Sequence, residues 1–255
     1  MTQILQDIIK ADPYHFADFT RDNYRHLLQL AQQSYAFRSY TNFNPQERFV
    51  LWRHDVDFSP HGARRLAKIE AEEGIVTTFF FHLHSEFYNL LEQEISDCVR
   101  HIIAMGHSIG LHFDTHYYKI QHVEELEQVL QFEKGLLEEI FKQEIRVFSF
   151  HNTTPFTMSC QQWQYAGMIN TYAEYFQTQV GYCSDSNGYW RFRRLQDVLE
   201  MAEDERLQVL THPAWWIPEP MSPRARVTRC IEGRAIRQHE WYDKLLAHLG
   251  RENVQ

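Results

Sequence analysis

The sequence predicts an α/β protein built on a parallel sheet, either open or closed into a barrel. Strand-like apolar segments alternate with segments of helical periodicity across the 255 residues, which is typical of strand–helix–strand units. The segment at residues 75–84 is a nearly continuous apolar run, as expected for a strand covered on both faces of a sheet. No low-complexity tract or Gly/Ser-rich linker divides the chain. We therefore expect a single domain over residues 1–255.

The first strand–helix unit illustrates the pattern. Residues 49–57 (FVLWRHDVD) are rich in strand formers and end in an acid. Ser59 and Pro60 then supply an N-cap and a first-turn proline for a helix that closes at Gly74. The same alternation continues along the chain. The predicted strands are residues 49–57, 75–84, 108–113 and 145–151, a segment around Tyr182, and residues 206–212.

The clearest helix covers residues 123–141, where apolar side chains such as Leu126, Leu130 and Leu137 mostly recur every three or four positions between glutamates. Another helix ends near Gly106. Both follow a predicted strand and precede the next one, which supports a parallel sheet.

Two flanks enclose the strand-bearing core, which we place at residues 48–216. The N-terminal flank, residues 1–47, is helical in places, notably around Leu27 and Leu28. The C-terminal flank, residues 217–255, contains a long amphipathic helix. We expect both flanks to cover the same domain.

Composition narrows the class of partner. The net charge is −9 and the pI is about 5.9, an acidic balance that disfavours a nucleic-acid-binding role. No run of about 18 apolar residues is present, so we expect no membrane span. The N-terminus lacks the basic start and apolar core of a secretory signal, which predicts a cytoplasmic protein. The sequence makes no prediction about the oligomeric state.

Acidic and histidine side chains recur where the predicted strands end. In parallel α/β barrels the active site gathers at the carboxyl ends of the strands. This recurrence at six strand ends is the strongest functional signal that the residues themselves provide. The residues concerned are Asp55, Asp57, His82, His84, His112, His151, Asp185 and His212.

Two short motifs suit a metal ion, and each has a structural alternative. Asp55 and Asp57 lie two apart on a strand, so both carboxylates can face one metal ion or one water molecule; equally, they can cap the following helix. His112 and His116 lie four apart, which on a helical turn places two imidazoles on one face. With 15 histidines in the chain, one such pair is expected by chance. Its position at a strand end is what favours a metal site.

The remaining strand-end residues are also open to two interpretations. A lone histidine such as His212 is more often structural than catalytic, but its strand-end position favours catalysis. Asp185 lies in SDSNG, where it can form a turn. His82 and His84 can be hydrogen-bonded strand histidines, and His151 can be a partner of a ligand rather than a ligand.

Together, these motifs resemble the polysaccharide deacetylases of the NodB-homology type, carbohydrate esterase family four. The family's Thr-Phe-Asp-Asp-Gly motif is similar to RHDVD at residues 53–57, and its His-Ser/Thr-x-x-His motif is similar to HFDTH at residues 112–116. Its Leu-x-His motif is similar to LTH at residues 210–212, and its Asp with a nearby Trp is similar to Asp185 with Trp190. The likeness covers residues 49–216 and is greatest for the divergent WbmS-like branch found in bacterial O-antigen clusters.

The resemblance implies a distorted, incomplete (β/α) barrel of the NodB-homology type, forming a single catalytic domain. It implies one divalent metal ion, zinc by default and otherwise Fe, Co, Ni or Mn. The implied metal ligands are Asp57, His112 and His116. The implied catalytic residues are Asp55 as general base, His212 as general acid and Asp185 as the group that tunes the pKa of His212. Trp190, Trp215, His151 and Arg53 are expected to contact the substrate.

Three features depart from the family pattern. One residue separates the two acids, Phe113 stands where the family has Ser or Thr, and FSFHN at residues 148–152 lacks the arginine of the third motif. Arg53 or His151 can take the place of that arginine. The extra residue between the acids leaves open which of Asp55 and Asp57 binds the metal ion.

The function implied is hydrolysis of an N-acetyl group on a sugar or polysaccharide precursor, in O-antigen or surface polysaccharide biosynthesis. Two alternatives are open: an amidase acting on a ureide-like substrate, and a carbohydrate-binding protein that retains metal without turnover. Trp215 and Trp216 either form an aromatic wall for a sugar ring or pack in the core. Asp55 and His212 argue against pure binding, which needs neither a base nor an acid.

Overall fold

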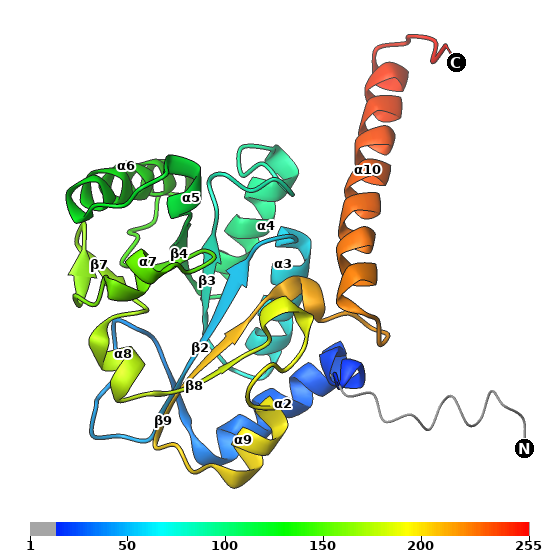
Figure 1. Ribbon diagram of the computed structural model, residues 1–255. Coiled ribbons are helices and arrows are strands. Elements are labelled where there is room, and N and C mark those ends of the chain that lie inside the picture. Colours follow the sequence, from blue (N-terminus) through cyan, green and yellow to red (C-terminus); the bar gives the residue numbers. More distant parts are fainter. Residues whose placement is uncertain (1–13, 255) are drawn as a thin grey trace, which may run out of the picture.

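The computed structural model describes residues 14–254, which form a curled, nine-stranded sheet with helices around its outside (Figure 1). The strand order is β6-β7-β5-β4-β3-β2-β9-β8, and β1 also pairs with β2. Every pairing is parallel except that of β6 with β7. The strands are β1 Ala36–Arg38, β2 Phe49–Val56, β3 Thr78–Phe81, β4 Ser108–Phe113, β5 Val147–Phe150, β6 Gln164–Tyr165, β7 Met168–Asn170, β8 Gly181–Ser184 and β9 Arg206–Thr211.

The long helices α2, α3, α4 and α6 lie along the outside of the sheet, whereas α10 extends away from the body of the molecule (Figure 1). Side-chain caps, each with a proline in the first turn, mark the starts of two of them: Ser59 caps α3 and Ser222 caps α10. The α-helices are α2 Arg21–Ser34, α3 Pro60–Glu72, α4 Gln93–Ala104, α5 Thr115–Tyr118, α6 Val123–Phe141, α7 Pro155–Ser159, α8 Glu174–Thr178, α9 Leu195–Met201 and α10 Pro223–His248. The short 3-10 helices are η1 Phe16–Phe19, η2 Ser186–Gly188 and η3 Pro213–Trp215.

Strand β2 separates two apolar clusters, and this alternation orients the site. Phe49 and Leu51 belong to the cluster inside the curl, and Val50 and Trp52 to a cluster beneath the outer helices. Successive side chains of a strand point to opposite faces. Arg53 and Asp55 therefore continue the inner face, toward the carboxyl ends of the strands.

The predicted α/β class and incomplete (β/α) barrel are confirmed by this topology. Helix α6 has the predicted bounds, and so does β4. The strand predicted at 75–84 is shorter, because pairing with β2 and β4 ends at Phe81. The sequence did not predict β1, β6, β7, α8 or α9, all of which are short.

The two predicted flanks contain α2 and α10. The first 13 residues of the N-terminal flank lie outside the described residues. Within residues 14–254, no helix combines the length and apolar character that crossing a bilayer requires.

Candidate active site

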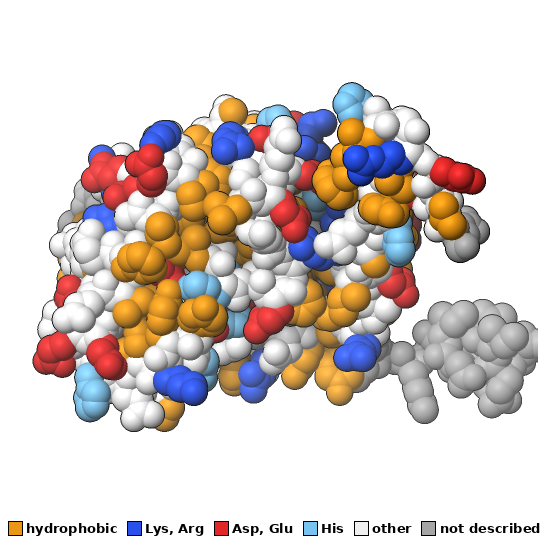
Figure 2. Space-filling model, turned by 90° about the horizontal axis from the view of Figure 1, so that it is seen from above, with side chains coloured by type: hydrophobic (Ala, Val, Ile, Leu, Met, Phe, Trp, Pro, Cys, Tyr) orange, Lys and Arg blue, Asp and Glu red, His pale blue; other side chains and the backbone are white. Residues whose placement is uncertain are grey.

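Six parallel strands end at one cavity, as the strand-end pattern predicts. The register aligns β2 with β3 and β9, β3 with β4, β4 with β5, and β8 with β9, so their carboxyl ends lie at the same edge of the sheet. The cavity there has a volume of about 970 Å³, and Figure 2 shows histidine side chains within the hollow face. The residues at or just beyond the strand ends are Asp57, His82, His112, His151, Asp185 and His212.

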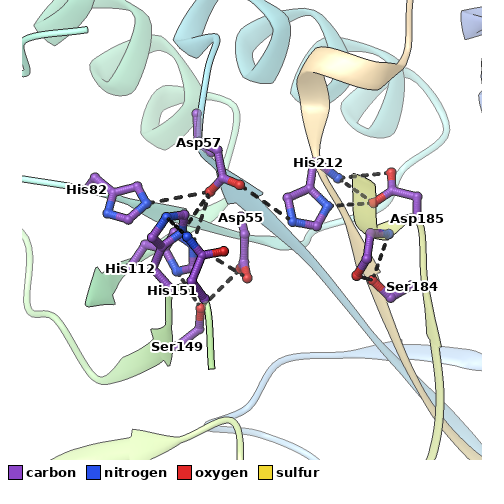
Figure 3. Close-up of polar contacts among 12 residues, drawn as sticks. Asp55, Asp57, His82, His112, Ser149, His151, Ser184, Asp185 and His212 are labelled. Atoms are coloured by element: carbon purple, nitrogen blue, oxygen red, sulfur yellow. Dashed lines mark hydrogen bonds and ion pairs between the residues drawn. The ribbon is translucent and has the colours of Figure 1, made fainter. Parts of the chain in front are cut away.

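A group of four side chains at the floor of the cavity could hold a metal ion. One ligand atom each from Asp57, His82, His112 and His151 lies within 4.8 Å of the others (Figure 3). Asp57 Oδ1 lies 3.1 Å from His112 Nε2 and 3.5 Å from both His82 Nε2 and His151 Nδ1. One carboxylate and three imidazoles are donors suited to zinc and other divalent transition metals.

The protonation states of Asp57 and His82 suit a metal ion, whereas Asp57 outweighs the effect of burial and raises the pKa of His151. Burial raises the pKa of Asp57, but its interactions with the neighbouring imidazoles of His112, His151 and His82 outweigh burial and hold the pKa well below its usual range. Burial, followed by the electrostatic effect of His112, lowers the pKa of His82 to about 4, so the His82 imidazole is neutral. Asp57 Oδ1 is buried and accepts no hydrogen bond of good geometry from residues 14–254. A buried carboxylate oxygen without a partner is costly, and a cation would satisfy it.

Ser149 fixes which nitrogen of His112 faces this group. The Ser149 hydroxyl donates to Asp55 Oδ1 at 3.2 Å and lies 2.7 Å from His112 Nδ1. Since the hydroxyl has one proton, it accepts from Nδ1–H, and the network assigns the unprotonated nitrogen to Nε2. His112 therefore presents a lone pair to Asp57, as a metal ligand with an oriented outer partner does.

Asp55 lies beside the group of four and is held by a buried arginine. Arg53 Nη2 lies 3.7 Å from Asp55 Oδ2 and 3.0 Å from the Tyr172 hydroxyl, and its Nη1 donates to Thr171. Burial raises the pKa of Asp55, but the charge of Arg53, followed by that of His112, lowers it overall. Asp55 is therefore an ionised carboxylate at neutral pH, with Arg53 in the position to restrain it that the sequence suggested.

Across the cavity floor, His212 forms a pair with the buried Asp185. His212 Nδ1 lies 2.6 Å from Asp185 Oδ1, and the His212 backbone N–H donates to both carboxylate oxygens at 3.0 Å. Burial opposes protonation, yet the Asp185 carboxylate raises the pKa of His212 to about 9. Its Nε2 lies 3.8 Å from Asp57 Oδ2, so a protonated imidazole faces the candidate metal group.

The structure places His116 outside the group of four. His112 belongs to β4, whereas His116 lies in α5, which begins only after Asp114. The two histidines therefore do not share a helical turn, contrary to the geometry that their spacing suggested. His116 lines the cavity, is exposed and has its Nε2 2.9 Å from the Asn152 carbonyl oxygen. A ligand role for His116 stays a prediction.

Two of the four residues predicted to contact substrate line the cavity. These are Trp215 and His151, and His151 also belongs to the group of four. Arg53 is fully buried behind Asp55. Trp190 stacks on Phe19, donates to Asp18 and does not line the cavity.

Three residues have a larger part in the site than the sequence motifs indicate. His82 matches no motif, and its position at a strand end is the only signal in the sequence that it can be a ligand as well as a strand histidine. Ser149 carried no motif. Trp216, not Trp190, donates to Asp185, with Nε1 2.9 Å from Oδ2.

No protein-family model matches the chain, and a search of curated proteins gives no match. Among solved structures, the chain is similar to a family 4 carbohydrate esterase from Bacillus anthracis, with 14% identity over 82% of this chain and 84% of that chain and a TM-score of 0.45. It is also similar to a CE4 family pseudoenzyme from Bacillus anthracis (16% identity, 76% and 63% covered, TM-score 0.42) and to peptidoglycan deacetylase PdaC from Bacillus subtilis (12%, 81% and 99%, 0.42). The chain thus spans 63% of the length of the pseudoenzyme.

Proposed function

We propose that the chain is a metal-dependent hydrolase that removes an N-acetyl group from a sugar or sugar precursor. One observation carries the proposal: a single cavity floor holds a candidate metal group, an ionised carboxylate and a protonated imidazole within reach of one another. Amide hydrolysis needs an activated water molecule, a base for its proton and an acid for the departing amine. Each of these has a candidate in this chain.

The proposed ligands are Asp57 and His112, completed by His151 and His82. A divalent cation held there, zinc in the simplest case and otherwise Fe, Co, Ni or Mn, supplies Lewis acidity that activates water and polarises the amide carbonyl. The unpartnered Asp57 Oδ1 and the neutral His82 support this choice of ligands. His116 is the alternative ligand that the family resemblance implies.

The chain's own residues then move the protons. Asp55, ionised beside Arg53, takes a proton from the attacking water. His212, protonated below about pH 9, gives a proton to the departing nitrogen. Asp185 keeps His212 charged and oriented through Nδ1. Each proton transfer contributes on the order of 10²–10⁴ in rate.

The size and lining of the cavity favour a substrate as large as a sugar. Its volume of about 970 Å³ exceeds what an acetamide group alone needs. Trp215, Tyr182 and Phe87 contribute aromatic surface to its wall, on which a sugar ring can pack, and Gln208 and Asn152 contribute polar groups. The O-antigen-branch resemblance adds a finer proposal, that short N-acetyl sugar precursors react faster than chitin-like or peptidoglycan polymers. A cytoplasmic location stays a prediction.

The test is acetate release from a panel of N-acetyl sugars, nucleotide sugars, chitin oligomers and ureides. We expect release from N-acetyl sugars by the metal-loaded protein, and loss of release in Asp55→Asn with metal content retained. Asp97→Asn, on the exposed surface of α4, is the matched control. Hydrolysis of ureides alone would reassign the chain as a ureide amidase. Sugar binding without any release would identify a binding protein.

A further inference from the structure

A second, smaller cleft lies next to the catalytic cavity and shares lining residues with it. It has a volume of about 220 Å³ and is lined by α3, η3 and α10. Phe58 and Phe87 line both the cleft and the catalytic cavity. The chain carries a net charge of −9, yet this cleft is lined by arginines. They include Arg21, Arg65, Arg229, Arg234 and Arg237.

Carboxylates neutralise only part of this charge. Arg234 is paired with Glu92 through two contacts, at 2.7 and 3.1 Å. Arg229 and Arg237 have only distant acidic partners, at 3.9 and 3.8 Å. Among residues 14–254, the side chains of Arg21 and Arg65 have no ion pair and no hydrogen bond. The Nε atom of Arg21 is buried without a partner.

The unpaired arginines repel one another. Burial lowers the pKa of Arg21, and the charges of Arg65 and Arg229 lower it further, whereas the carboxylate of Glu219 offsets part of this effect. Burial also lowers the pKa of Arg65, followed by the charges of Arg229 and Arg64. Like charges gathered in a cleft are unfavourable unless an anion joins them. The start of α3 adds positive potential, because its N-cap Ser59 and its first-turn residues Pro60 and Gly62 line the same cleft.

We propose that this arginine cleft binds a phosphate or diphosphate group. Guanidinium groups match phosphate oxygens in geometry as well as in charge, and a cleft of about 220 Å³ accepts a group of this size. Two sources share this chemistry: a separate phosphate compound and the phosphate of the substrate itself. The shared wall of Phe58 and Phe87 favours the substrate, an assignment that rests on the proposed deacetylase function.

The first experiment tests the anion site without turnover. Pyrophosphate binding to the full chain is measured by calorimetry for the wild type, for Arg21→Ala/Arg65→Ala and for Arg100→Ala. Arg100 is exposed on α4 outside the cleft and serves as the matched control. We expect the double variant to bind roughly tenfold more weakly or worse, since hydrogen bonds to charged groups are strong, and Arg100→Ala to bind like the wild type. Wild-type binding that is absent, or equal in the double variant, would overturn the site.

A measurement on the unaltered chain guards against a variant that fails to fold. Pyrophosphate is expected to protect Arg21 and Arg65 from an arginine-selective reagent, read by mass spectrometry, while Arg100 reacts at the same rate with and without it. If pyrophosphate left the reaction rates of Arg21 and Arg65 unchanged, as it should for Arg100, the site would be contradicted even where the double variant is unstable.

The second experiment separates the two sources. For the same N-acetyl sugar with and without a diphosphate group, the double variant is expected to raise KM roughly tenfold only for the phosphate-bearing form, with pyrophosphate as a competitor. Pyrophosphate that binds without competing would overturn the assignment to substrate and identify a separate ligand. If the wild-type protein binds pyrophosphate but releases no acetate, the proposed deacetylase function is wrong, and the anion site is still supported.

Discussion

Two buried polar groups lie on opposite faces of β2, and they differ in whether their members satisfy one another. On the outer face, Glu70 accepts from the hydroxyls of Tyr24 and Thr77, and its Oε1 lies 2.7 Å from His54 Nε2. His54 Nδ1 is in turn bonded to the Thr211 hydroxyl at 2.7 Å. This outer network is enclosed by α2, α3 and the sheet.

The inner group, formed by Asp57 and the three imidazoles around it, differs from the outer network both in its hydrogen bonding and in its exposure to a cavity. Asp57 Oδ1 has no hydrogen bond of good geometry, although three imidazoles surround it, and the group opens on the cavity. The outer network stabilises the fold because its groups are paired. The inner group is arranged for a ligand that the chain itself does not supply. His54 and Asp55 are neighbours in sequence but have different roles. His54, on the outer face of β2, stabilises the fold, whereas Asp55, on the inner face, lies beside the candidate metal group.

The largest expected effect is that of removing the inner carboxylate. Asp57→Ala should abolish metal binding and lower acetate release by roughly a thousandfold or more, because the metal ion supplies several kcal/mol of transition-state stabilisation. Metal analysis and the acetate assay measure both. Full metal content in this variant would show that the inner group is not the metal site.

Removing the base or the acid should separate chemistry from metal binding. Asp55→Asn and His212→Gln are expected to lower turnover by roughly 10²–10⁴ each while retaining metal. The same two assays serve here. If Asp55→Asn strips the metal ion, then Asp55 is a ligand and the roles of the two acids are reversed.

Disrupting the outer network should lower the stability of the fold without changing its metal content. Glu70→Ala leaves Tyr24, Thr77 and His54 without their acceptor, and we expect a loss of about 3 kcal/mol in the free energy of unfolding. Denaturant titration measures this, and metal content per folded chain should be unchanged. An unaltered unfolding midpoint would show that the outer network does not stabilise the fold.

The smallest effect is a displacement of the alkaline limb of the pH–rate profile. The raised pKa of His212, about 9, means that the acid is present below that pH and is lost as pH rises through it. Turnover should therefore hold up to about pH 9 and then fall. Asp185→Asn removes the charge that raises this pKa, so the limb should move to lower pH by about a unit or more. A limb in the same place in both proteins would exclude His212 as the acid.

Much of the fold could be predicted because its central strands are long apolar runs that end in polar residues. The ends of β2, β4, β5 and β9 followed from that pattern. Strands β6 and β7 could not be predicted, since segments of two or three residues carry no alternation and depend on their neighbours for pairing.

The sequence predicts where the candidate site lies, but it does not predict which histidines form it. The strand ends identified the edge of the sheet where Asp57, His112 and His212 meet. Which further histidine joins them depends on the local path of the chain. His116 follows a change from strand to helix, so its spacing from His112 does not fix its direction, whereas His82 is positioned by the pairing of β3 with β2.

Anomalous diffraction from crystals of the zinc-loaded protein would locate the metal ion and identify its ligands. We expect one ion about 2.0–2.2 Å from a carboxylate oxygen of Asp57 and from His112 Nε2. At least one of His82 and His151 should complete its coordination at about 2.0–2.1 Å. An ion that is bound by His116 in place of both, or that lies away from Asp57, would show that this group of four is not the metal site.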